Sequence, residues 1–208
     1  MSERGWVQRE LAEEFPELAL HTHTLDARPG ASPPELRERL RVLSSRFRGM
    51  HAIALRRNPI PRAYRVFFRQ IGLDPDTHRT PIEQAAVKRL LDGEFASQNL
   101  LDDGLLIALV ETGVPVWALD AAKVEGPLGV RVGVAEHREG SPGRLPAGRI
   151  LVADAERPLA SLFGELAPGR GVQDHTSRMT LFAVQVAGVP QIHVDEALWQ
   201  VISALGAA

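Results

Sequence analysis

The sequence contains no cysteine, and only two of its 24 basic residues are lysines. Without cysteine, the chain has no disulfide scaffold, no thiolate zinc site and no cysteine nucleophile. No window approaches the roughly 18 uninterrupted apolar residues of a membrane span. The charged N-terminus also lacks the apolar run of a secretory signal. We therefore expect a cytoplasmic protein with no membrane partner.

Several signature motifs of enzymes are also missing. The sequence has no Gly-x-Ser-x-Gly elbow, no glycine-rich phosphate loop with lysine and no His-Glu-x-x-His pair, so the common hydrolase, kinase and oxidoreductase signatures are absent. His21 and His23 share one side of an expected strand and can share a metal ion, but no third ligand stands at a convincing spacing. We interpret both as histidines hydrogen-bonded to neighbours, and we expect no metal and no cofactor.

The charge distribution is uneven. The net charge of −2 argues against a general nucleic-acid coat, and we expect no DNA partner. Between residues 35 and 69, however, ten arginines face two acids, a local charge of +8. Arginine forks bind phosphate in a bidentate manner, so this segment fits a basic face for RNA. Because arginine is the usual cation of the whole chain, it also fits an ordinary solvated surface.

Hydrophobic spacing and proline and glycine signals predict the elements of the fold. Helices are expected at 5–14, from a capping box at 32–35 to Arg48, between Pro59 and Gly72, at 99–112 and at 194–205. A further helix is expected from a capping box of Thr80 and Glu83 to Gly93, with an apolar face of Val87, Leu90 and Leu91. Strands are expected at 18–25, 51–55, 115–120, 130–134, 150–153, 158–163 and 180–186, with a turn at 139–148. This order predicts an α+β fold in one domain, with a mixed, mostly antiparallel sheet flanked by helices.

The stretch 97–120 is central to these elements. A polar entry at Asn99 leads into a segment that is apolar on every side, which is typical of a helix buried within a domain. Gly113 just past its end and Pro115 two residues later are stop signals. The pattern therefore predicts a buried helix that turns sharply into a strand or loop ending at Asp120.

This stretch carries a family resemblance. The matching residues are Asn99, Asp103, Glu111, Gly113, Pro115 and Asp120. Their order resembles the B-three/four editing (tRNA-binding) module of the phenylalanyl-tRNA synthetase beta subunit, and more closely the free-standing proteins that consist of that module alone. Similar pieces lie before this stretch at 62–75 and 79–83, and after it at 150–154 and 171–176. The resemblance implies a module at 51–208 that ends in an amphipathic helix, with residues 1–50 as a helix-and-strand extension packed on it.

The resemblance also implies a function. The synthetase module hydrolyses tyrosine wrongly esterified to tRNA, so the expected partner is the aminoacylated 3′ end of a tRNA. Two departures bear on the substrate: Trp117 stands where the synthetase has a histidine, and Phe182 stands where it has a glutamate thought to read the tyrosine hydroxyl. An apolar pocket discriminates only weakly among small aliphatic side chains. We therefore expect a small or apolar amino acid rather than tyrosine.

The expected site has three parts. The substrate pocket is formed by Gly113, Val114, Pro115, Val116, Trp117 and Phe182. The catalytic candidates are Asn99, His175 and Thr176, which with backbone N–H groups of the turn would place water and stabilise an oxyanion. The candidate RNA contacts are Arg56, Arg57, Arg62 and Arg178. Each candidate also has a structural interpretation. Asn99 fits a helix N-cap, and residues 173–176 fit a plain Asx or Thr turn. Glu111 and Asp120 fit residues that brace the corner, and Arg178 fits a solvated surface.

Three functions fit these residues. The first is a free-standing, trans-editing aminoacyl-tRNA deacylase. The second is a non-catalytic tRNA- or RNA-binding module. The third is an amino-acid-binding module without RNA contact, which the sequence pI of 6.4 and the apolar pair Trp117 and Phe182 favour. All three rest on a pocket at the corner after the central helix. A structure with Trp117 far from Phe182 and no cavity at the corner would remove the basis for the assignment.

Overall fold

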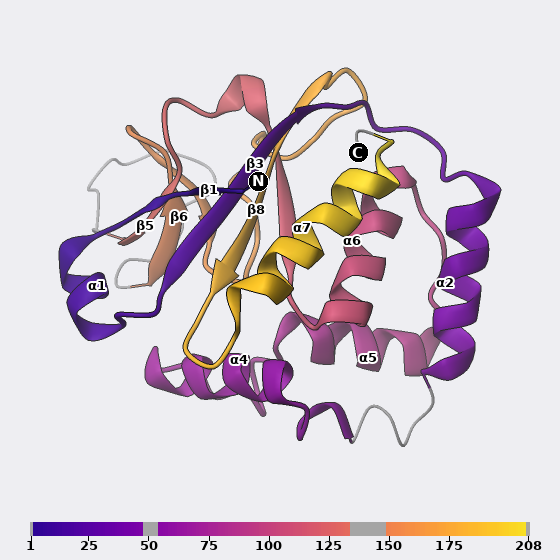
Figure 1. The fold of residues 1–208 in the computed structure, drawn as a ribbon, viewed down its shortest axis with the longest axis horizontal. Helices are drawn as coiled ribbons and strands as arrows, with labels where there is room; N and C mark the ends of the chain where they lie inside the picture. Colours follow the sequence, from indigo (N-terminus) through magenta and orange to yellow (C-terminus); the bar gives the residue numbers. More distant parts are fainter. Residues whose placement is uncertain (1, 48–53, 134–148, 207–208) are drawn as a thin grey trace.

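The computed structural model describes residues 2–47, 54–133 and 149–206, and it contains two sheets beside a group of helices (Figure 1). The first sheet is antiparallel, with the order β1-β3-β8-β4. Its strands are β1 (Glu3–Arg4), β3 (Ala19–Asp26), β8 (Arg178–Gln185) and β4 (Val116–Asp120). Because β3 and β8 pair over their full length at the centre, β4 is an edge strand.

The second sheet has the order β2-β5-β6-β7. Its strands are β2 (Trp6–Val7), β5 (Gly129–Val132), β6 (Ile150–Ala153) and β7 (Pro158–Ser161). The β2–β5 pair is parallel and the other pairs are antiparallel. The predicted α+β class, with mixed and mostly antiparallel strands flanked by helices, is confirmed.

The N-terminal residues differ from the helix predicted at 5–14. Trp6 and Val7 form strand β2, and helix α1 (Arg9–Glu14) begins later. The backbone N–H of Trp6 donates to the carbonyl of Leu128, and its indole lies over Gly129, where a Cβ atom would come within 2.0 Å of the ring. The predicted helix is present from Arg9, but its predicted start was wrong, because the strand partner of Trp6 and Val7 is more than 120 positions away in the chain. The division of the chain at residue 50 stays a prediction, although the strands before it join both sheets.

Five further helices complete the described fold. They are α2 (Pro34–Arg46), α4 (Pro59–Gln70), α5 (Pro81–Asp92), α6 (Leu100–Thr112) and α7 (Gln191–Ala204), with the short 3-10 helix η1 (Ala121–Lys123) after β4. The predicted capping box of Thr80 and Glu83 is present at the start of α5. Ser32 does not cap α2 as expected; its hydroxyl donates instead to the buried carboxylate of Asp103.

Two other local predictions need correction. Helix α5 buries Ile82 and Ala86, whereas Leu90 and Leu91 are 46% and 81% exposed, because only the first two turns of the helix reach the core. Of the strand expected at 51–55, only the last two residues are described, and they are helical. The rest of that strand, residue 134 and the turn expected at 139–148 lie outside the described residues.

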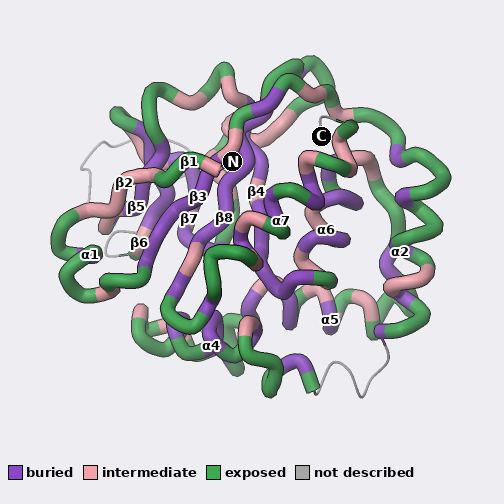
Figure 2. The backbone as a smooth tube through the Cα atoms, in the orientation of Figure 1, coloured by how far each residue is buried: buried purple, intermediate pink, exposed green. Residues whose placement is uncertain are grey.

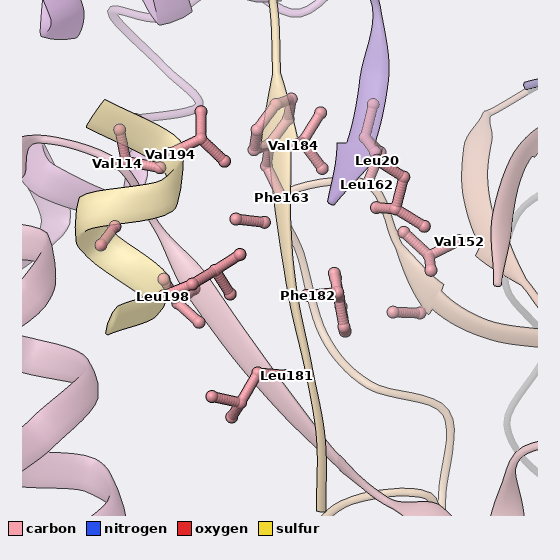
Figure 3. Packing of buried hydrophobic residues seen from close by; sticks show 14 of the residues in the cluster. Leu20, Val114, Val152, Leu162, Phe163, Leu181, Phe182, Val184, Val194 and Leu198 are labelled. Atoms are coloured by element: carbon pink, nitrogen blue, oxygen red, sulfur yellow. The ribbon is translucent and has the colours of Figure 1, made fainter. Parts of the chain in front are cut away.

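The first sheet is the middle layer of the molecule. Buried residues run along β3 and β8 (Figure 2), and helices α6 and α7 cover one face of this sheet (Figure 1). Figure 3 shows β8 edge-on, with Leu181 pointing toward α7 and Phe182 pointing to the opposite side, where Val152 and Leu162 lie. Successive side chains of a strand point to opposite faces, so β8 contributes to two packed layers at once.

Helix α6 is apolar all round because it has neighbours on several sides. It packs against α2, α5 and α7 and is antiparallel to the strand β4 that follows it. Gly104 lets α7 approach closely, since a Cβ atom there would lie 3.2 Å from the Cβ of Ala204. The predicted buried helix is confirmed. Across the described ranges, every helix is too short or too polar to traverse a bilayer.

Candidate substrate pocket

A tight corner joins α6 to β4. Gly113 has a φ of 75°, a conformation that glycine adopts without strain, and its N–H donates to the carbonyl of Leu109. The Thr112 hydroxyl donates to the carbonyl of Ala108 and accepts the N–H of Val114. These bonds end the helix and reverse the chain within three residues, at the predicted position.

Two aromatic rings stack on the strand that leaves the corner. Trp117 of β4 is directly opposite Phe182 of β8, with ring centroids 5.4 Å apart and planes 11° apart. Phe182 is 2% exposed and Trp117 is half-buried. The pair expected to mark the pocket is therefore in direct contact.

Phe163 is the centre of a larger aromatic cluster. Its ring lies within 6.0 Å, centroid to centroid, of the rings of Tyr64, Phe67, Phe68 and Trp117. Its φ of 58° is the one positive value among the described non-glycine residues. Such a conformation costs roughly 1–3 kcal/mol and persists only where its surroundings fix it. The buried rings from α4 fix Phe163 beside Trp117.

A cavity of about 570 Å³ opens along the free edge of β4, and we call it the corner pocket. Its apolar wall consists of Leu105, Leu106 and Leu109 of α6, Pro115, Val116 and Trp117 of the corner, Phe163, and Pro81 and Ala85 of α5. Its volume is within the range of small-molecule sites, roughly 300–1,000 Å³. The corner pocket is therefore large enough for an amino-acid side chain.

Few polar side chains line the corner pocket. They are Gln84 and Lys88 of α5 and Glu165. The Gln84 amide donates to the carbonyl of Arg79, and the Lys88 ammonium pairs with Asp92. The carboxylate of Glu165 has no hydrogen bond or ion pair with any described residue. A carboxylate, an amide and an ammonium thus stand around an otherwise apolar cavity.

The predicted pocket residues divide into two groups. Pro115, Val116 and Trp117 line the corner pocket. Val114 is fully buried, and Gly113 packs against Ile60 and Pro61 of α4. Phe182, stacked on Trp117, supports the wall from behind.

Asn99 is not brought to the corner pocket. It is the N-cap of α6: its side-chain carbonyl accepts the N–H of Asp102, and its amide donates to the Asp102 carboxylate. Helix α6 has 13 residues, so about 20 Å of helix separates Asn99 from Gly113. The structure thus gives Asn99 the capping geometry that was the alternative to catalysis.

His175 and Thr176 also lie away from the corner. They belong to a turn in which the buried Thr176 hydroxyl accepts the N–H of Gln173, while His175 is exposed. This turn precedes β8, whose first residues pair with the end of β4 at Asp120 rather than with its start. The full length of β4, about 16 Å, separates the turn from the corner.

The four candidate RNA-contact arginines lie in two places. Arg178, at the start of β8, is 3.6 Å from the carboxylate of Asp26. Arg56 pairs with Asp76 and Glu83. Arg57 and Arg62 are exposed and form no ion pair with any residue that the structure describes. Arg62 lies on α4, whose start packs against Gly113 of the corner, and Arg57 lies in the turn just before that helix.

A buried ion-pair network fixes that helix. Arg65 of α4 donates to the carboxylates of Glu83 and Asp76, and both Arg65 and Glu83 are nearly inaccessible. Desolvation lowers the pKa of Arg65, but the hydrogen bonds and charges of its two partners outweigh this and raise it above its ordinary value. The hydrogen bond from Arg65 lowers the pKa of Asp76. The network joins α4 to the first turn of α5, which borders the corner pocket.

The acids of the family-like stretch have structural partners. Asp103 is 1% exposed and accepts the hydroxyls of Ser32 and Ser97 and the N–H of Gln98. Glu111 forms an ion pair with Arg39 of α2. Asp120 accepts the N–H of Ala122 at the start of η1. None of the three lines a described pocket.

Of the two strand histidines, His21 has the hydrogen-bonded environment that was expected for both. His21 is 3% exposed, and its Nε2 is 2.9 Å from the side-chain oxygen of Gln185. His23 is half-buried and lines a separate cavity of about 440 Å³ beside α7. In the part of the chain that is described, no three His, Asp or Glu side chains are grouped as a metal site would require.

Sequence reasoning missed most of the pocket. Leu105, Leu106 and Leu109 were assigned to a uniformly buried helix, although the all-round apolar pattern equally fits a helix with one side open to an apolar cavity. Phe163 and Glu165 gave no signal, because their places depend on how the segment after β7 folds back against α5 and β4.

Comparison with known proteins finds a limited sequence similarity. No family model matches the chain. Over 79 residues, the chain is 38% identical to the phenylalanine–tRNA ligase beta subunit of Shewanella oneidensis, a match that covers 35% of this chain and 10% of that subunit. The chain thus spans about a tenth of the length of that relative. This partial similarity agrees with the resemblance drawn from the motifs.

Proposed function

We propose that this protein is an aminoacyl-tRNA deacylase that hydrolyses the ester of a mischarged tRNA, with the amino-acid side chain held in the corner pocket. The observation that carries the proposal is the apolar cavity of about 570 Å³ beside the corner of α6 and β4, with a carboxylate at its border. The partial similarity to a tRNA ligase subunit supports a substrate related to tRNA.

The lining of the corner pocket favours a small or apolar amino acid. Leucine, proline, valine and aromatic side chains form its wall, and the polar groups are confined to α5 and Glu165. A site that reads a phenolic hydroxyl needs a buried partner for it, and Phe182 offers none at the position stacked behind Trp117. Tyrosine is therefore the less suitable substrate.

The chemistry assigns roles to the polar residues. Glu165 takes a proton from a water molecule as the water oxygen bonds to the ester carbonyl carbon. The Gln84 amide or the Lys88 ammonium stabilises the developing oxyanion. The bond to the ribose oxygen then breaks, and the proton passes to that oxygen, giving a free amino acid and uncharged tRNA. Asn99, His175 and Thr176 take no part in this scheme, because about 16–20 Å of strand or helix separates them from the corner.

The test is a panel of tRNAs mischarged with alanine, serine, valine, leucine or tyrosine, with loss of the aminoacyl ester measured over time. We expect hydrolysis of at least one small or apolar aminoacyl ester. Leu106→Trp, which fills the corner pocket, should abolish it, whereas Leu91→Trp on the exposed face of α5 should not. Glu165→Gln should lower kcat by about 100-fold or more. No ester loss with any tRNA would end the proposal.

A second function has one observation in its favour. Arg57 and Arg62 are exposed and form no ion pair with any described residue. Arg62 lies on α4, which packs against Gly113, and Arg57 lies in the turn just before it. A non-catalytic tRNA-binding module predicts salt-sensitive tRNA binding that weakens when both become alanine, without ester loss. A thermal shift with free amino acids and no affinity for tRNA would instead support an amino-acid-binding module.

A further inference from the structure

The start of strand β4 presents an unpaired backbone edge to the corner pocket. Leucines of α6 line the pocket from the helix-covered face of the first sheet. Phe182 points to the opposite face (Figure 3), and Trp117, stacked on it, lines the pocket from that side. Val116 of the same strand also lines the pocket. Because β4 is the outermost strand of this sheet, a cavity that contacts both faces at β4 lies against the free edge of the strand.

The hydrogen bonds at the end of β4 fix the direction of its backbone groups. Gly171 forms a bridge with β4 on the side away from β8. On that side, the N–H of Asp120 donates to the carbonyl of Arg170. In an antiparallel ladder, the N–H and C=O groups of alternate residues point to the same edge. Val116 and Ala118 therefore direct their backbone N–H and C=O groups away from β8, toward the free edge.

The backbone groups of Val116 are available to a ligand. On the free edge, neither has a hydrogen bond with any residue in the described ranges. The same alternation directs the carbonyl of Val184 to the β4 side of β8, where it accepts the Tyr64 hydroxyl beyond the start of β4. By contrast, the Gln84 amide and the Lys88 ammonium already have partners. The N–H of Val116 is thus a donor of the corner pocket that needs to break no bond in order to bind.

We propose that Val116 binds the aminoacyl group of the substrate through a one-residue antiparallel bridge. The C=O of Val116 accepts an N–H of the α-ammonium, and its N–H donates to the ester carbonyl oxygen. The inference rests on the proposed function. An α-amino acyl group fits because its N–H and C=O have the spacing of a residue in a neighbouring strand, where a hydrogen-bonded pair exchanges both bonds.

This bridge supplies a preorganised oxyanion donor. As the water oxygen bonds to the ester carbonyl carbon, the electron pair of the C=O bond moves onto the oxygen that the N–H of Val116 contacts. The hydrogen bond becomes charge-assisted and therefore stronger than in the ground state. The strand already holds this N–H in place. The bridge also selects the substrate class, because an acyl group without an α-amino group loses one of the two hydrogen bonds.

The binding test uses amide NMR spectra of the full chain with L-leucinamide, a stable analogue of an aminoacyl ester. We expect the Val116 amide proton to shift downfield as the ligand is added. The amide proton of Leu119, which the alternation directs toward β8, should stay unchanged. 4-Methylpentanamide, which lacks the α-amino group, should bind about tenfold more weakly or worse. No binding of L-leucinamide, an unmoved Val116 resonance in the saturated complex, or equal affinity for the two amides overturns the bridge.

A backbone variant separates the N–H of Val116 from its side chain. Incorporating 2-hydroxyisovaleric acid in place of Val116 keeps the side chain and replaces the N–H by an oxygen atom. This variant should bind L-leucinamide about tenfold more weakly, and kcat for ester hydrolysis should fall by about 100-fold or more. The matched control is lactic acid in place of Ala118, which removes an N–H of the same edge from a residue that does not line the pocket. Circular dichroism of each variant checks that it is folded.

The outcomes separate this inference from the proposed function. Binding of L-leucinamide with the Val116 shift, but without hydrolysis of any aminoacyl ester, overturns the deacylase and supports the bridge. Ester hydrolysis with wild-type kcat in the folded Val116 variant overturns the bridge and leaves the deacylase standing. An equal loss of kcat in the Ala118 variant would also overturn the bridge, because the effect would then not depend on the N–H that faces the pocket.

Discussion

Replacing Trp117 by alanine tests the central geometry of the corner pocket. The indole stacks on Phe182 at 5.4 Å and contacts Phe163 at 6.0 Å, centroid to centroid. Each aromatic pair is worth about 0.5–1.5 kcal/mol beyond burial, and a Trp-to-Ala change in a core costs about 3–5 kcal/mol. Because Trp117 is only half-buried, we expect a loss near the lower limit, about 3 kcal/mol.

The same substitution should alter substrate choice. Removing the indole enlarges the corner pocket on the β4 side, so larger apolar amino acids should gain relative to small ones. Differences of one methylene in an apolar pocket change kcat/KM by about 10–200-fold, which sets the scale of the expected shift. Urea denaturation measures the stability, and the mischarged tRNA panel measures the selectivity.

Trp199→Ala is the matched control. Trp199 is 59% exposed on α7 and has no aromatic neighbour among the described residues, so its loss should cost only about 0.5 kcal/mol. For a chain of 208 residues, Trp117→Ala should lower the Tm by roughly 6–12 °C. Equal destabilisation by the two substitutions would refute the stacked arrangement, and an unchanged selectivity profile would refute the role of the indole as pocket wall.

Three further predictions concern stability. Asn99→Ala should cost about 1 kcal/mol, the usual value of an N-cap, and leave kcat for ester hydrolysis unchanged, as denaturation and kinetics will measure. Arg65→Met should cost about 3 kcal/mol or more, because it leaves the buried Glu83 carboxylate short of a partner; adding Glu83→Gln should recover part of the loss. Burial raises the pKa of Asp154, but the hydrogen bonds from three backbone N–H donors outweigh burial and lower this pKa below the ordinary 3.8. The Asp154 carboxylate therefore stabilises the fold above about pH 4, and this contribution is lost as the pH falls through the folded-state pKa. Asp154→Asn should therefore flatten the acid limb of a plot of unfolding free energy against pH.

Each of these has a contrary outcome. A fall in kcat for Asn99→Ala without a change in KM would restore its catalytic role. A double variant less stable than Arg65→Met alone would mean that Glu83 is stabilised by Thr80 and Arg56 without Arg65. An unchanged acid limb for Asp154→Asn would show that its backbone donors, at 2.8–3.0 Å, are not specific for the charged carboxylate.

Local sequence signals correctly predicted the helix ends that are determined by contacts between residues close together in the sequence. Gly113 and Gly93 end α6 and α5 in left-handed conformations, and the box of Thr80 and Glu83 starts α5, because capping is a contact between near neighbours in sequence. The error at Trp6 and the exposed face at Leu91 arose where the partner is distant in the chain. The residue types there fit more than one environment, and only packing selects between them.

The amino-acid sequence by itself determined the class of the fold, the buried helix, its sharp corner and the apolar character of the residues after it, since these follow from periodicity and from proline and glycine. Only the tertiary structure decided that the corner borders a cavity, that Phe163 and Glu165 complete it, and that Asn99, His175 and Thr176 lie away from it. The reason is geometric: α6 and β4 each carry the chain about 16–20 Å away from the corner. Residues that are near in a motif can therefore be far apart in space, and residues far apart in sequence can share a pocket.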